Sequence, residues 1–297
     1  MIRSGFLKSI AVPLLLFLLT LACTLVIGVQ YHVSYHNVAL PAGQGFWEFL
    51  WSHPGSWLWG LSYSLPLLGI LLVHEMGHFV ACRRHGIEAT LPHFLPAPTL
   101  IGTFGAFIKI RSPFSSKKAL FDVGLAGPLA GFLAALPVIA VGISWSRLVE
   151  KGTLDGGLTL GEPLLFTLLG RLFLGVVPAQ RELLVHPMAF AGWFGLLATA
   201  FNLFPIGQLD GGHILYALLG KKKAYCAGVT SVIILVILGV VFWQGWLLWA
   251  LLATLIGLRH PPIFEEERLD AKRKALAFVA LLVFIFSFTP APLSVAP

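Results

Sequence analysis

Charged residues are scarce in this chain. Only 11% of its 297 residues are Asp, Glu, Lys or Arg, whereas 57% are hydrophobic, and the mean hydropathy is +0.87. Soluble globular proteins carry about 25% charged residues, so the composition excludes that class. Apolar runs of roughly 15 to 24 residues can cross a bilayer, and they lie near residues 10–29, 57–82, 119–145, 187–205, 224–242, 246–258 and 275–289. We therefore predict an all-α polytopic membrane protein with six to seven transmembrane helices.

Cysteine is almost absent as well. The three cysteines, Cys23, Cys82 and Cys226, are isolated in the sequence, which argues against a disulfide framework or a cysteine-based metal site. No stripe of basic residues alternates with aromatic ones, so we expect no nucleic acid partner. No loop exceeds roughly 45 residues, so we expect no inserted domain.

The positive charges indicate an orientation. With a cytoplasmic N-terminus and seven spans, sixteen of the twenty Lys and Arg residues would face the cytoplasm, as the positive-inside rule requires. The net charge of +7 then has anionic lipid as its partner. The first apolar run is too long for a cleavable signal peptide and predicts a signal-anchor helix. We expect an integral protein of a bacterial inner (plasma) membrane.

The second apolar run contains three ionisable residues, His74, Glu75 and His78. Since an α-helix turns about 100° per residue, the two imidazoles share one face and can hold one zinc ion. Glu75 projects beside that face, where it can accept a proton from water, which is the H-E-x-x-H arrangement of metallohydrolases. Burying three such groups in a membrane costs several kcal/mol, which argues against a purely structural role. Relative to Arg83 and Arg84, the site lies roughly 8 to 14 Å inside the cytoplasmic boundary.

A catalytic zinc usually takes three protein ligands, so a third must come from elsewhere. Asp210 is the best candidate. Pro205 and Gly207 break the preceding apolar helix, and irregular backbone at membrane depth is tolerated where it is buried in protein or lines a wet cavity. In the alternative interpretation, Asp210 only caps the helix that follows it.

The segment 92–113 is too apolar for a plain loop and too rich in proline and glycine for a helix. Phe104, Phe107 and Ile108 predict a short strand or a re-entrant β-hairpin beside the active site. An unpaired strand edge there can bind an unwound substrate segment by β-augmentation. Alternatively, the hairpin only seals the cavity.

These motifs resemble those of the site-2 proteases, which are intramembrane zinc metalloproteases. The resemblance rests on His74-Glu75-x-x-His78, on Asn202-x-x-Pro205-x-x-x-Leu209-Asp210-Gly211 and on Gly127-Pro128-Leu129-Ala130-Gly131. It is nearest to the subgroup without a PDZ domain found in cyanobacteria and plastids. We accordingly predict an N-terminal signal-anchor helix and outer loop over 1–56, a catalytic core over 57–219 and C-terminal transmembrane helices over 220–297.

The resemblance implies zinc bound by His74, His78 and Asp210, with Glu75 as general base and later general acid. Asn202 matches the position that orients the substrate peptide or stabilises the oxyanion; a neutral amide can do so without burying another charge. An interhelical hydrogen bond is the alternative role for Asn202. The implied substrates are single-span transmembrane proteins.

Two other functions remain open. Intramembrane His and Asp also mark ion paths, so a metal transporter is one, although no second, repeat-related ligand set is visible. A catalytically inert, chaperone-like relative is the other, and the presence of Glu75 together with three candidate ligands argues against it.

Overall fold

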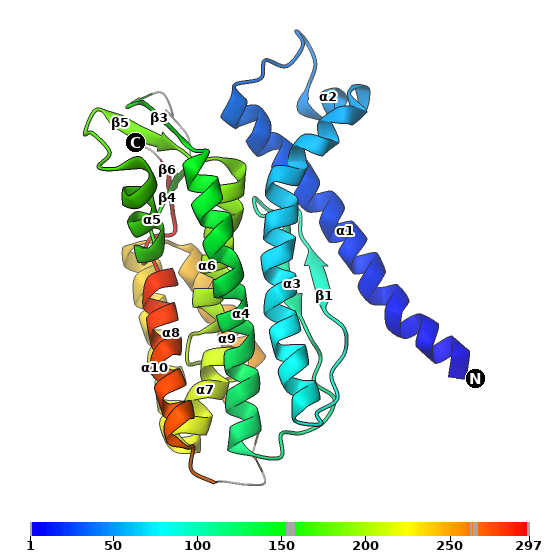
Figure 1. The fold of residues 1–297 in the computed structure, drawn as a ribbon, viewed down its shortest axis with the longest axis vertical. Helices are drawn as coiled ribbons and strands as arrows, with labels where there is room; N and C mark the ends of the chain where they lie inside the picture. Colours follow the sequence, from blue (N-terminus) through cyan, green and yellow to red (C-terminus); the bar gives the residue numbers. More distant parts are fainter. Residues whose placement is uncertain (1, 153–157, 262, 264–266, 296–297) are drawn as a thin grey trace.

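The computed structural model describes residues 2–152, 158–261, 263 and 267–295. The chain is mostly helical (Figure 1). The helices are α1 (Ile2–His36), α2 (Phe46–Ser52), the 3-10 helix η1 (Pro54–Gly60), α3 (Leu61–Arg84), α4 (Lys117–Ser144), α5 (Leu164–Leu174), α6 (Pro187–Asn202), α7 (Asp210–Leu219), α8 (Lys221–Val241), α9 (Gly245–Ile256) and α10 (Ala271–Ser287). The strands are β1 (His93–Pro96), β2 (Thr103–Phe107), β3 (Arg147–Glu150), β4 (Leu158–Leu160), β5 (Arg181–Leu184) and β6 (Leu293–Val295).

Within the described residues, four helical segments are long and apolar enough to cross a membrane. They are Ile10–His36, Pro54–Arg84, Lys117–Ser144 and Lys221–Val241. The predicted count of six to seven spans is therefore not confirmed. Helices α6, α9 and α10 have 16, 12 and 17 residues, or roughly 18 to 26 Å at 1.5 Å per residue, which is less than the hydrocarbon thickness of about 30 Å.

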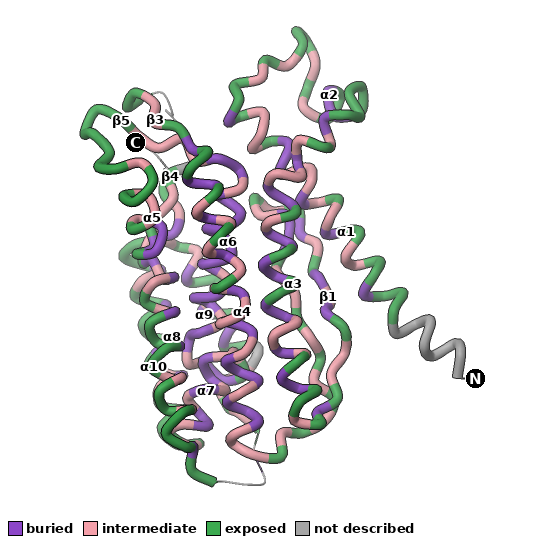
Figure 2. Tube along the Cα trace, in the orientation of Figure 1, coloured by how far each residue is buried: buried purple, intermediate pink, exposed green. Residues whose placement is uncertain are grey.

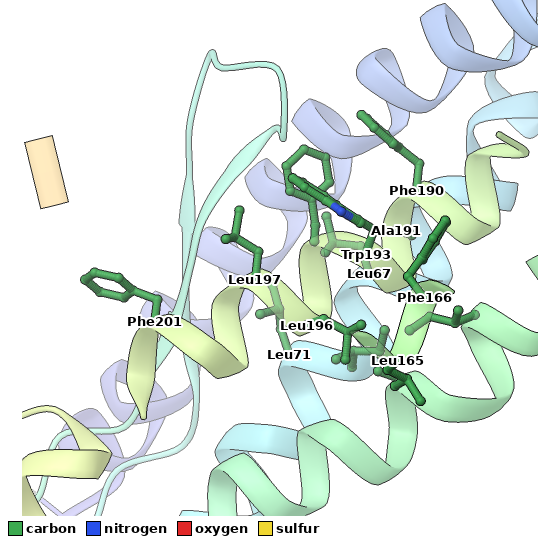
Figure 3. Close-up of a cluster of buried hydrophobic side chains, with 14 of the residues drawn as sticks. Leu67, Leu71, Leu165, Phe166, Phe190, Ala191, Trp193, Leu196, Leu197 and Phe201 are labelled. Atoms are coloured by element: carbon green, nitrogen blue, oxygen red, sulfur yellow. The ribbon is translucent and has the colours of Figure 1, made fainter. Parts of the chain in front are cut away.

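Helix α6 is enclosed largely by other parts of the protein. Nearly all of its residues are buried, from Pro187 to Phe201, and α3 and α4 cover it (Figure 2). Its apolar side chains form the main core with Leu67, Leu71, Leu165 and Phe166 (Figure 3). A helix that is enclosed by protein has apolar residues on every face. Its length need not match the thickness of the hydrocarbon layer.

The segment 92–113 forms an antiparallel pair of strands, β1 and β2, in which His93 is opposite Phe107 and Phe94 is opposite Ala106. Strand β1 packs on α1, and β2 contacts α3. The strand prediction is therefore confirmed for Phe104 and Phe107, and Ile108 follows directly after β2. Whether the hairpin re-enters the membrane stays a prediction.

Two further strand pairs lie at the opposite end of the bundle from the start of α10 (Figure 1). Strand β3 pairs with β5, and β4 pairs with β6 near the C-terminus. The sequence analysis did not predict these strands. Helix α5 lies beside them and corresponds to the apolar segment after Pro163.

Candidate metal centre

The site is built where α3 packs against α4, the most extensive helix contact in the fold. A Cβ atom at Gly127 would lie 2.0 Å from His78 Nε2, and one at Gly131 would lie 2.9 Å from His74 Nδ1. A Cβ atom at Gly77 would lie 2.5 Å from the carbonyl oxygen of Ala126. The absence of side chains at these positions lets both imidazoles lie between the helices.

Asp210 reaches the same point from α7. Its Oδ2 lies 3.3 Å from His74 Nε2 and 3.3 Å from His78 Nε2, and the two Nε2 atoms are 3.1 Å apart. Donor atoms around a tetrahedral metal with bonds of about 2.0–2.1 Å are separated by about 3.3 Å. The three side chains therefore fit one metal ion.

The imidazole of His78 is held in the orientation that a metal ligand needs. Its Nδ1 donates a hydrogen bond of 2.7 Å to the backbone carbonyl of Val123 on α4. This bond places the proton on Nδ1 and leaves the Nε2 lone pair directed at the donor cluster, as is usual for metal-ligating histidines.

The turn between α6 and α7 places Asp210. Gly207 has a φ of +46°, and a Cβ atom there would lie 1.8 Å from the carbonyl oxygen of Gly257. A Cβ atom at Gly211 would lie 2.0 Å from the carbonyl oxygen of Leu203, so the turn folds tightly onto itself. Leu209 occupies the N-cap position of α7, and no side chain caps this helix. The structure therefore assigns the Asp210 carboxylate to the donor cluster instead of to the helix cap.

Glu75 and Asn202 adjoin the three donors. The Glu75 side chain is buried, and its carboxylate accepts a hydrogen bond from the backbone amide of Ile108, just after β2. Asn202, at the end of α6, has its Nδ2 3.4 Å from His74 Nε2. The structure thus brings a carboxylate, a carboxamide and a strand end to one cluster.

The other predicted site residues lie at its edge. Phe104 and Phe107 on β2 have exposed fractions of 63% and 44%, so their rings are available to another molecule. His213 does not contact the donors through a described hydrogen bond; its Nδ1 lies 2.9 Å from His260 Nε2.

His85 follows the last residue of α3 and contacts α4. Its Nε2 lies 2.9 Å from Asp122 Oδ2. Asp122 also accepts hydrogen bonds from Arg273 Nε and Nη2, at 2.8 and 2.5 Å. The cluster joins α3, α4 and α10 near the metal site, and no local sequence pattern indicates a contact between residues 151 positions apart.

A model of peptidase family M50 matches residues 62–243, more than half of the chain. The chain belongs to peptidase family M50. It is 29% identical over 303 residues to the probable zinc metalloprotease EGY1, chloroplastic, of Arabidopsis thaliana, covering 94% of this chain and 53% of that protein. The rice protein of the same name is 33% identical over 242 residues, covering 77% and 40%.

The matched M50 region contains His74, Glu75, His78, Asn202 and Asp210. A third relative, the probable zinc metalloprotease EGY2, chloroplastic, of Arabidopsis thaliana, is 30% identical over 78% of this chain and 42% of its own length. The chain spans about half or less of these curated relatives. The resemblance to the site-2 proteases is therefore confirmed at the level of the family.

Proposed function

We propose that this M50 protein is a zinc-dependent intramembrane peptidase that hydrolyses peptide bonds within or near transmembrane segments of single-span proteins. One observation carries the proposal: His74, His78 and Asp210 place three donor atoms 3.1 to 3.3 Å apart. They do so on helices buried inside an apolar bundle, with the Glu75 carboxylate beside them.

Each residue has a defined role in this proposal. His74, His78 and Asp210 hold the zinc ion, which, when bound, polarises the scissile carbonyl and makes water more acidic. Glu75 accepts a proton from the attacking water and donates it to the amine that leaves. Asn202 donates a hydrogen bond to the developing oxyanion from its amide, which adds no charge to the buried site.

The substrate has to enter as an extended strand. A helical peptide bond is already hydrogen-bonded within its own helix and is shielded by side chains, so a transmembrane helix must unwind locally before hydrolysis. Strand β2 pairs with β1 on one side and ends at the Glu75 contact. Its other edge and the exposed rings of Phe104 and Phe107 are suited to bind that strand.

Location follows from the same features. The four candidate spans make this a membrane protein. Its relatives are named as chloroplastic, and the positive-inside count bears on the orientation alone, with the site nearer the cytoplasm. We keep the bacterial location and the orientation as part of the proposal.

A metal transporter is the alternative that the donor set also permits. Two substitutions separate the functions. Glu75→Gln removes the proton acceptor but no ligand, so we expect it to abolish cleavage of a model transmembrane peptide while zinc content and folding stay nearly unchanged. Asp210→Ala removes a ligand, so both zinc and cleavage should be lost. Zinc quantification and mass spectrometry of the products measure both effects.

Turnover by the Glu75→Gln variant at the original rate would exclude this mechanism. Zinc binding without cleavage in the unsubstituted protein would favour transport or an inert relative. Substrates with Gly or Asn near the cut should be cleaved faster, because each weakens a helix by up to about 1 kcal/mol relative to Ala. Cuts confined to loops outside the membrane would contradict the proposed substrate class.

A further inference from the structure

A cavity lies beside the turn that carries Asp210. It has a volume of about 360 Å³ and lies where α7 meets α8, against the chain that follows α9. Its lining includes Gly207, Gly212, Lys221, Lys222, Tyr225 and Arg259. The metal donors are not among its lining residues, so it is distinct from the metal centre.

Three cations, Lys221, Lys222 and Arg259, line this cavity. Among the described residues, no carboxylate forms an ion pair with Lys221, Lys222 or Arg259. The Arg259 guanidinium lies 5.6 Å from the centre of the Tyr225 ring, which fixes its position without neutralising it. Like charges held around one cavity repel each other, and a bound anion removes this cost.

His260 lines the cavity and contacts His213 of α7. His260 donates a hydrogen bond from Nδ1 to the carbonyl oxygen of Pro261, so its Nε2 accepts the proton of His213 Nδ1. The His260 ring packs against Tyr216 with centroids 4.5 Å apart. Neither histidine therefore supplies a negative group that would compete for the three cations.

The backbone adds further donors. Lys221 and Lys222 open α8, a helix of 21 residues, and the first amides of a helix have no partner within it. Gly220 immediately before them has a φ of +80°, a conformation that turns the chain sharply into this helix. Free amides at a helix start favour an anion, and here they accompany three cationic side chains.

The position of the cavity identifies the source of the anion. Lys221 begins a candidate membrane span, so the cavity lies where an apolar helix leaves the hydrocarbon layer. Helices α3, α7 and α10 also have an end on this side of the bundle (Figure 1). Basic residues gather at the end of α3 and at the starts of α4 and α10: Arg83, Arg84, Lys117, Lys118, Lys272 and Arg273. Basic pockets between membrane helices are suited to phospholipid headgroups.

We propose that this cavity binds the phosphodiester of an anionic phospholipid through Lys221, Lys222 and Arg259. Gly207 and Gly212 are among its lining residues, and they flank Asp210 in the sequence. A headgroup in the cavity therefore contacts the turn that positions the third metal donor. Lipid binding restrains this turn and stabilises the donor geometry, whatever reaction the site performs.

Lipid retention by the purified full chain tests the proposal. Native mass spectrometry in detergent should show tighter binding of phosphatidylglycerol than of phosphatidylcholine. Lys221→Gln combined with Lys222→Gln should weaken phosphatidylglycerol binding about thirtyfold, and Arg259→Gln alone about fivefold, since each cation near a lipid surface contributes about 1 kcal/mol. Lys272→Gln combined with Lys274→Gln is the matched control, because it removes two exposed charges at the start of α10.

Hydrogen exchange gives a second readout that does not depend on activity. Phosphatidylglycerol should slow exchange over residues 205–212 in the unsubstituted protein and in the control, but not in the Lys221/Lys222 variant. Circular dichroism establishes that each variant is folded, and the Arg259 variant provides the test if the lysine variant is not.

Three results would overturn the proposal. One is equal retention of both lipids. Another is equal weakening by the control pair, which would mean general surface attraction. The last is displacement of the lipid by millimolar glycerol phosphate at equal affinity, because a soluble phosphate ester would then be the ligand.

Discussion

The imidazoles of His74 and His78 can approach one point because α4 presents a glycine opposite each of them. The Cβ of an alanine at position 127 would occupy space only 2.0 Å from His78 Nε2. The imidazole cannot yield without breaking its 2.7 Å hydrogen bond to Val123. A single methyl group at this position therefore competes directly with the metal-binding atom.

We expect Gly127→Ala to weaken zinc binding on the order of 10- to 100-fold, the range seen for changes beside metal-ligating histidines. Titration with a zinc chelator measures the affinity. Gly69→Ala in α3 is the control, since a Cβ there meets nothing within 4 Å. It should leave zinc affinity unchanged. Equal affinities for both variants would show that Gly127 does not set the site geometry.

His186, at the far end of the molecule, is a titrating residue with a structural role. Its Nδ1 accepts a hydrogen bond from the backbone amide of Met188 and so caps α6. Burial, and after it the positive charges of His36, His32 and Arg147, lower the pKa of His186 to about 4. The neutral imidazole is thus the form that the fold requires.

The sign of the pH effect follows from this lowered pKa. Below pH 6.5 the unfolded chain takes up a proton at His186, whereas the folded protein does not until about pH 4. The contribution of His186 to the free energy of unfolding should therefore be full above pH 6.5 and should fall as the pH drops towards 4. His186→Asn keeps a capping oxygen and removes the titration. The unfolding temperature should change less between pH 7 and pH 5 in this variant than in the unsubstituted protein.

At the scale of elements, β2 is linked to α3 directly after its last residue. The amide of Ile108 donates a hydrogen bond to the Glu75 carboxylate there. Proline at position 108 has no N–H and therefore removes this donor. We expect Ile108→Pro to slow cleavage about fivefold or more with zinc content unchanged, which corresponds to the loss of one hydrogen bond. Ile108→Val keeps the amide and should cleave at nearly the original rate. If Ile108→Pro cleaves substrate at the original rate, the amide at the end of β2 has no role in catalysis.

Helix α10 is attached to α4 through Arg273 and Asp122. Both side chains are about a quarter exposed, at 23% and 27%, so solvent screens their interaction only partly. We expect Asp122→Asn to lower the free energy of unfolding by about 1 to 2 kcal/mol, because it removes the charge from three hydrogen bonds. Thermal unfolding in a single detergent measures the change.

Lys118→Gln provides the control for this prediction. Lys118 pairs with Glu267, and both side chains are exposed, at 39% and 64%. Exposed pairs of this kind contribute little, so the unfolding temperature should hardly change. Similar losses in both variants would mean that the Arg273 contact has no special role in holding α10.

Local patterns were enough to predict part of this molecule. The spacing of His74 and His78 follows from helix geometry alone, and Pro205 with Gly207 indicated the break that precedes Asp210. The same applies to the hairpin, because Phe104 and Phe107 lie between glycine and proline residues that exclude a helix. Each of these inferences needed only residues close together in the sequence.

At the scale of the whole molecule, the sequence was less informative. Hydropathy cannot distinguish a helix enclosed by protein from one enclosed by lipid, so the apolar run at 187–205 predicts that α6 is buried but not what encloses it. The pairing of β4 with β6 joins Leu160 to Leu293, and Asp122 reaches Arg273. Contacts over such distances leave no periodicity in a single sequence, and only the folded chain shows them.

The order of the metal donors along the chain has a consequence for biosynthesis. His74 and His78 are made early, but Asp210 follows more than 130 residues later and is placed only once α6 and α7 have turned back onto α3. Ribosomes add about 5 to 20 residues per second, so for several seconds the nascent chain carries two donors without the third. A metal centre assembled in this order cannot bind its ion through all three donors until α7 has been made and has packed against α3.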